Sequence, residues 1–223
     1  MLRFISVALL LTAGSVLAQP APGVSPSLTG RLEGQVYISP VGTFRMTSPV
    51  LPELGGSISD TSNVVTFQDQ FNVHVSIAAF PQDATQRWEL STRGLKDYLS
   101  YFFDTFVMSD FQKIFPSARV EGSSFDTDMM GGALVVFTLL PGGSMFGEKH
   151  AVLGALETPP VAKRGNLLFV HDGVIYIVST ELAERVLERS TYKKTPEEED
   201  VILRQRLADI LKKIEFTKPA SDR

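Results

Sequence analysis

Alternating apolar and polar residues predict β-strands between residues 31 and 80. Residues 35–38 and 43–48 flank a Ser-Pro-Val-Gly turn signal and are expected to pair as a hairpin. In residues 73–79, apolar Val and Ile alternate with His and Ser, which indicates one buried and one wetter face. Two further strands are predicted over residues 58–61 and 64–68.

The pattern changes to helical spacing after Pro81. Asp83 can cap a helix, and apolar residues recur at helical spacing between residues 86 and 106. Gly94 is expected to loosen this helix near its middle. The predicted apolar stripe consists of Trp88, Leu95, Leu99, Phe102 and Phe106, widened by Tyr98 and Phe103.

The most distinct hairpin lies later in the chain. Residues 166–170 and 175–179 flank Asp172-Gly173, a pair that supplies the positive φ angles of a two-residue turn and so fixes the strand register. In that register both faces of the two strands are apolar. Residues 133–140 are also apolar on both faces, so we expect these strands in the middle of a sheet covered by helices. Strands are also predicted over residues 119–128 and 151–156.

A final helix is predicted from Thr195 to about Ile214. Thr195 is a suitable N-cap, Pro196 suits the first helical position, and Glu198 completes a capping box. Acidic residues near its start and lysines near its end suit the helix dipole. Its predicted apolar stripe is Leu203, Leu207, Ile210, Leu211 and Ile214.

These elements predict one folded unit. We expect an α+β fold, a single α/β/α sandwich with a largely antiparallel twisted sheet and helices on both faces. The domain is predicted over residues 31–217, with a tail at residues 218–223.

The residues before this domain have a different character. One arginine precedes an apolar run from Phe4 to Thr12, and small residues lead up to Ala18, which is the pattern of a secretory signal peptide over residues 1–18. We expect cleavage between Ala18 and Gln19, followed by a flexible, proline-rich linker to residue 30. The alternative is a membrane anchor, but the run is shorter than the ~20 residues needed to span a bilayer. The mature protein is therefore expected in the periplasm or outside the cell, and not as an integral membrane protein.

Composition narrows the possible chemistry. The 223 residues include 21 Lys and Arg against 25 Asp and Glu, and 43% are hydrophobic, which is the balance of a globular chain. The absence of cysteine excludes disulfides, thiolate metal sites, a cysteine nucleophile and a lipid anchor on cysteine. A net charge of -4 leaves no basic surplus to neutralise phosphates, which argues against nucleic-acid binding.

The order of the segments resembles the PsbP-like superfamily. Its fold is shared by the extrinsic photosystem II protein, DcrB-type bacterial envelope proteins and a eukaryotic Ran-binding import factor. The resemblance rests on YISPVGTFRMTSP at residues 37–49, the strands within 64–79, the long helix, LLFVHDGVIYIVST at residues 167–180, and the closing helix. It implies a non-catalytic protein that binds a partner or assists an assembly. It assigns no individual functional residue.

Catalytic motifs are missing from the sequence. No G-x-S-x-G, H-E-x-x-H or G-x-G-x-x-G sequence occurs, and Gly147 is followed by Glu148 where a Walker A loop requires lysine. Ser144 with His150 nearby is a candidate nucleophile and base, but no third member or oxyanion hole accompanies them. We therefore expect no enzymatic activity and no cofactor.

Histidines provide the candidate metal ligands. Imidazole and carboxylate groups can bind Zn²⁺ or Cu²⁺ without cysteine, but the spacing here does not bring three ligands together, so metal binding stays open. Asp126 and Asp128 could also meet a cation, although an exposed acidic strand end is the favoured interpretation. The histidines are His74, His150 and His171, with Glu148 and Asp172 as carboxylate partners.

Aromatic residues are concentrated in the predicted long helix and just after it. They could line a pocket for a lipid or another apolar molecule, or form a surface for a partner protein. The simpler interpretation is a helix packed flat on the sheet. These residues are Tyr98, Tyr101, Phe102, Phe103, Phe106, Phe111 and Phe115.

The function predicted from the sequence is non-enzymatic. We expect an exported binding or assembly-factor protein with a protein partner in the cell envelope. The alternatives are a carrier of a small apolar ligand through the aromatic segment 95–115, and a hydrolase or metalloenzyme using His150 or His171.

Overall fold

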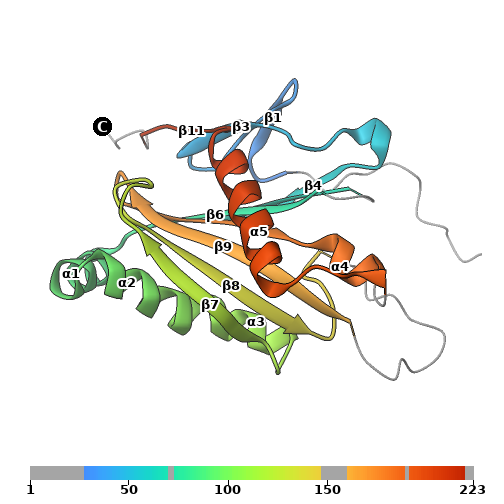
Figure 1. Cartoon of the computed structure of the whole chain (residues 1–223). Coiled ribbons are helices and arrows are strands. Elements are labelled where there is room, and N and C mark those ends of the chain that lie inside the picture. Colours follow the sequence, from blue (N-terminus) through green and yellow to red (C-terminus); the bar gives the residue numbers. More distant parts are fainter. Residues whose placement is uncertain (1–27, 70–72, 147–159, 189–190, 219–223) are drawn as a thin grey trace, which may run out of the picture.

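The residues described by the computed structural model are 28–69, 73–146, 160–188 and 191–218 (Figure 1). Antiparallel sheets and helices are stacked in layers, which confirms the predicted α+β sandwich. The predicted signal peptide, with its cleavage point between Ala18 and Gln19, lies outside the described residues, and so does the predicted strand 151–156.

The larger sheet contains seven strands within the described residues, in the order β4-β5-β6-β10-β9-β8-β7. Every neighbouring pair is antiparallel. Strand β10 is buried along its whole length, and β8 is buried except at its last residue, as their two apolar faces predict. The strands are β4 (Ser57–Asp60), β5 (Val64–Gln68), β6 (His74–Pro81), β7 (Arg119–Asp126), β8 (Ala133–Pro141), β9 (Val161–His171) and β10 (Val174–Glu181).

The Asp-Gly hairpin has the predicted register. His171 pairs with Val174, and Asp172 and Gly173 take the positive φ angles of 47° and 75° that the turn requires. The side chains on the two faces of this hairpin belong to two separate cores, one on each side of the sheet. The sheet is therefore the middle layer of the molecule.

Helices cover one face of the larger sheet through a nearly continuous segment (Figure 1). It consists of α1 (Ala84–Arg93), α2 (Leu95–Phe102), the π-helical turn η2 (Phe103–Met108) and α3 (Ser109–Ile114). The other face carries α5 (Pro196–Leu211), which follows the short helix α4 (Ala183–Glu188). The capping boxes of α1, formed by Asp83 and Gln86, and of α5, formed by Thr195 and Glu198, are both present.

Trp88 does not lie in a buried stripe, contrary to prediction. Gly94 ends α1 with a φ of 77°, so the helical phase of α1 does not continue into α2. No residue of α1 is buried, and Trp88 is 62% exposed.

A smaller sheet packs on the same side as α5. Its described strands have the order β1-β2-β3-β11, and β2 with β3 form the predicted opening hairpin. The rings of Phe44 and Tyr176 lie 6.3 Å apart and join this sheet to the larger one. The strands are β1 (Arg31–Glu33), β2 (Val36–Ile38), β3 (Phe44–Thr47) and β11 (Ile214–Phe216), and the 3-10 turn η1 (Pro52–Leu54) follows β3.

The last helix ends earlier than predicted. α5 stops at Leu211, and Ile214 pairs with Met46 as the first residue of β11. Ile214 is buried at the spacing that a longer helix would also give, so periodicity alone cannot separate the two conformations. Pairing with β3 favours the strand over the helix, because it supplies hydrogen-bond partners for the backbone groups of residues 214–216.

Candidate functional site

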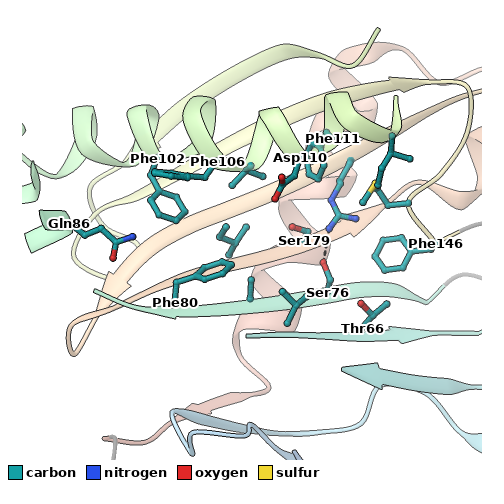
Figure 2. A pocket seen from close by; sticks show the side chains of 17 residues that line it. Thr66, Ser76, Phe80, Gln86, Phe102, Phe106, Asp110, Phe111, Phe146 and Ser179 are labelled. Atoms are coloured by element: carbon teal, nitrogen blue, oxygen red, sulfur yellow. Dashed lines mark hydrogen bonds between the residues drawn. The ribbon is translucent and has the colours of Figure 1, made fainter. Parts of the chain in front are cut away.

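A cavity of about 440 Å³ lies between the aromatic helical segment and strands β5 and β6 (Figure 2). Its volume falls in the range of small-molecule binding sites in proteins. Aromatic and aliphatic side chains form most of its lining, and a few polar groups converge on one part of it.

Strand alternation builds the floor of the cavity. Ser76, Ala78 and Phe80 on β6 face the helices, whereas the residues between them face the core on the α5 side. On β5, Thr66 pairs with Ser76 and Val64 pairs with Ala78, so these side chains continue the same surface. The floor is therefore apolar near Phe80 and hydroxyl-bearing near Thr66.

Three aromatic residues of the helical segment form the opposite wall (Figure 2). Phe102 and Phe106 are one turn apart, with ring centroids separated by 5.0 Å. Phe111 comes five residues after Phe106, a spacing that a regular α-helix would rotate by about 140°. The π-helical turn η2 lies before Phe111 and helps to bring both rings to the cavity.

The predicted aromatic residues thus divide into two groups. Phe102, Phe106 and Phe111 line the cavity, and Phe106 is 46% exposed at its edge. The others do not line it: Tyr98, Phe103 and Phe115 are buried in the core under the helices, and the half-buried Tyr101 packs against Phe106 and beneath Arg93.

Arg164 is the buried charged group among the described residues that line the cavity. It extends from β9, is 5% exposed, and its guanidinium lies 5.4 Å and 5.0 Å from the ring centroids of Phe111 and Phe146. It donates hydrogen bonds to Ser76 Oγ at 2.6 Å and to Glu181 Oε1 at 3.1 Å. Burial lowers the pKa of Arg164 and Glu181 opposes that shift, but a guanidinium keeps its charge in proteins.

Glu181 balances this charge from the end of β10. Its side chain is 1% exposed and also accepts hydrogen bonds from Ser144 Oγ and from the backbone N–H of Met145. Ser144 in turn accepts a hydrogen bond from the backbone N–H of Phe146 at 3.0 Å. The candidate nucleophile Ser144 therefore orders the loop whose residues Met145 and Phe146 line the cavity. Its candidate base, His150, lies outside the described residues.

His74 stacks on Phe146 at the same end of the cavity. Their ring centroids are 5.2 Å apart and the planes differ by 10°. His74 Nδ1 is buried and has no hydrogen-bond partner in the part of the chain that the structure describes. Burial lowers the pKa of His74 despite the nearby carboxylate of Glu181, so the imidazole is neutral at neutral pH.

The candidate metal ligands are not brought together. His171 lies beside Asp172, with Nε2 3.8 Å from Oδ2, at the far end of the sheet from His74, about 23 Å away along β6. His150 and Glu148 lie outside the described residues. Among the described residues, no group of three or more His, Asp or Glu side chains has the geometry to hold a metal ion.

Asp126 closes the turn after β7. Its carboxylate accepts hydrogen bonds from the backbone N–H groups of Asp128 and Met129, at 2.9 Å and 3.2 Å. Asp128 lies beyond the strand, so the two carboxylates do not share a strand face as predicted for a cation site.

A second buried charge lies on the α5 side of the sheet. Lys163 Nζ contacts the carboxylates of Glu121, Glu199 and Asp200, and its side chain is fully buried. Burial by itself would lower the pKa of Lys163, but the hydrogen bonds with Asp200 and Glu121 outweigh it and raise the pKa. Neither Lys163 nor Arg164 was predicted from the sequence as a site residue. The sequence signal that could have identified them is the occurrence of two adjacent cationic residues near the start of a long apolar strand.

The protein is thus an α+β sandwich, and a groove lined mostly by apolar side chains lies between its aromatic helical segment and the larger sheet. No protein-family model and no curated protein match the chain. Among solved structures the chain is similar to a variant of the protein Mog1, with 10% identity and a TM-score of 0.43 over 79% of this chain and 92% of the other. It is also similar to a cyanobacterial PsbP from Synechocystis, with 12% identity and a TM-score of 0.47 over 92% of this chain and 100% of the other.

A third similar structure comes from Bacteroides thetaiotaomicron. The identity is 13% and the TM-score 0.37, and the match covers 86% of this chain but 52% of the other. The similar structures thus include a PsbP, as the order of segments indicated. These likenesses concern the arrangement of elements and assign no ligand or partner to this chain.

Within the part of the chain that the structure describes, no helix is both long and apolar enough to cross a membrane.

Proposed function

We propose that this protein is a non-enzymatic binding protein that holds a small apolar ligand in the cavity between the aromatic helices and strands β5 and β6. The observation that carries the proposal is the cavity itself, which has the volume of a ligand site and keeps Phe106 exposed at its edge. A helix packed flat on the sheet would leave no such space.

Replacing Phe106 with aspartate is expected to weaken binding of the neutral apolar dye N-phenyl-1-naphthylamine by about tenfold or more. The new carboxylate would stand at the cavity edge, where it stays hydrated, so the fold should survive. Phe102 is unsuitable for this test because it is 4% exposed, and a carboxylate there would disrupt the core. Dye titration by fluorescence measures the effect, and native mass spectrometry of the purified protein should show a co-purified apolar molecule.

Trp88→Asp is the matched control. Trp88 is an exposed aromatic residue of the same helical segment that does not line the cavity, so dye binding should stay unchanged. Loss of binding in both variants, or in neither, would contradict the proposal. A wild-type protein that neither binds the dye nor carries a ligand would do the same.

A protein partner in the cell envelope is the second candidate function. It is favoured by Trp88, which is 62% exposed on α1, since exposed tryptophans are often central to protein interfaces. It is also supported by the signal peptide predicted from the sequence, which would export the protein to the periplasm or the medium.

A photo-reactive amino acid at position 88 should then cross-link one dominant envelope protein in intact cells. Position 113 is the control, because Lys113 is exposed on α3 away from Trp88 in sequence and should give no such product. Mass spectrometry identifies the adduct. Recovery of the uncross-linked monomer alone from both positions would count against this candidate.

A further inference from the structure

Arg164 retains hydrogen-bonding capacity in the cavity lining. A guanidinium carries five N–H donors. Three hydrogen bonds are formed, to Ser76, Glu181 and Asn166, at 2.6, 3.1 and 3.2 Å. The two remaining N–H groups have no acceptor among the residues that the structure describes, although the side chain is only 6% exposed. Buried charged donors without an acceptor are costly, so this arrangement suits a ligand that brings one.

The acceptors around Arg164 are already committed. Glu181 accepts from Arg164, Ser144 and the backbone of Met145, and it is not part of the cavity lining. Asp110 does line the cavity, but it is 69% exposed and pairs with Lys113 at 2.6 Å. The buried part of the cavity therefore offers a ligand the charged donors of Arg164, and the buried acceptors among the described lining side chains are the neutral hydroxyls of Ser76 and Ser179, with no buried carboxylate.

We infer that the ligand is a single-chain amphiphile ending in a carboxyl or ester group, whose oxygen accepts hydrogen bonds from Arg164 while the chain lies against Phe102, Phe106 and Phe80. This inference rests on the proposed function and adds the chemistry of the ligand's head group. Charge-assisted hydrogen bonds are stronger than neutral ones, so the head group would fix the orientation of the chain.

Lauric acid, methyl laurate and laurylamine test the inference, because they share one alkyl chain and differ in the head group. Displacement of N-phenyl-1-naphthylamine from the wild-type protein gives the three affinities. We expect the acid and the ester to have an affinity at least about tenfold higher than that of the amine, because the ammonium group of the amine would face the guanidinium. Tighter binding of the acid than of the ester would show that the site prefers an ionised head group. Equal binding of the two would show that a carboxylate oxygen and an ester oxygen serve equally well as the acceptor.

The double variant Arg164→Met with Glu181→Gln removes both buried charges together, so neither is left without its partner. In this variant the three compounds should bind within about twofold of one another, because the alkyl contacts remain. Undiminished discrimination in the folded double variant would overturn the inference. If that variant does not fold, the wild-type series decides.

The outcomes also separate this inference from the proposed function. Equal binding of all three compounds by the wild-type protein would overturn the head-group assignment and leave the apolar site intact. Binding of none, together with failure to bind the dye, would overturn both.

Discussion

Replacing Lys163 with methionine is expected to lower the free energy of unfolding by about 3–5 kcal/mol. Lys163 Nζ lies 2.6 Å from Asp200 Oδ1 and 3.2 Å from Glu199 Oε2, and it also contacts Glu121. Methionine has a similar size but no charge, so the three carboxylates would repel one another beside the sheet. Glu199, with a side chain 1% exposed, would be the least hydrated of them and would keep Arg185 as its cationic partner. Urea unfolding followed by circular dichroism measures the loss.

The effect should be concentrated at the start of α5. Lys163 also donates a hydrogen bond to the backbone carbonyl of Pro196 at 3.1 Å, so one strand side chain holds the first turn of the helix. Hydrogen exchange in α5 should therefore accelerate more than in β10. Folding raises the pKa of Lys163 above its unfolded value of about 10.4. The stability that its charge contributes is therefore fully present below the unfolded pKa and is lost only as the pH rises through the folded pKa. The difference from wild type should thus persist from pH 7 to pH 9.

Lys113→Met provides the comparison. Lys113 pairs with Asp110 at a similar distance, 2.6 Å, but its side chain is 74% exposed. Water and salt screen such a pair, so the change should cost less than about 1 kcal/mol. If the two lysine variants lost equal stability, burial would not be the source of the effect.

Replacing Arg164 alone with methionine is expected to cost a similar amount, about 3–5 kcal/mol. The cause is Glu181, whose carboxylate would stay buried with its cationic partner removed. Ser76 would lose its donor as well. Urea unfolding of the single variant gives the magnitude.

The second substitution, Glu181→Gln, should restore most of that stability. Glutamine carries no charge; its Oε1 can still accept the hydrogen bond from the backbone of Met145, and its amide N–H group can donate to Ser144 Oγ, whose hydroxyl can also accept. A thermodynamic cycle of the two single variants and the double variant gives the coupling energy directly. A double variant as unstable as Arg164→Met alone would show that the loss comes from packing against Phe111 and Phe146 instead of from the unpaired charge.

Local signals in the sequence predicted much of the fold. The Asp172-Gly173 turn set the register of β9 with β10, and the N-cap Asp83 and the Thr195 capping box marked the starts of α1 and α5. These features depend on residues within a few positions of one another, so they can be recognised without the rest of the chain. Trp88 was misplaced because a helical stripe was continued through Gly94, where the chain leaves the helical conformation.

The site was predicted only in part. The aromatic segment was predicted to form either a pocket wall or a partner surface, and three of its seven aromatic residues line the cavity. The polar part was missed because β9 begins at Val161, earlier than the apolar hairpin suggested, so Lys163 and Arg164 fell before the predicted strand. Because successive side chains of a strand point to opposite faces, Lys163 and Arg164 lie on opposite faces of the sheet.

By itself, the sequence determined the local elements, the strands with two apolar faces and the chemistry that a chain without cysteine cannot perform. Only the tertiary structure decided that β6 lies between β5 and β10, which places Ser76 beside Arg164 across 88 positions of the chain. The cavity follows from that order, because its floor and its aromatic wall come from separate segments. Periodicity reports which face of a segment is buried, whereas the partner against which that face packs depends on contacts between distant residues.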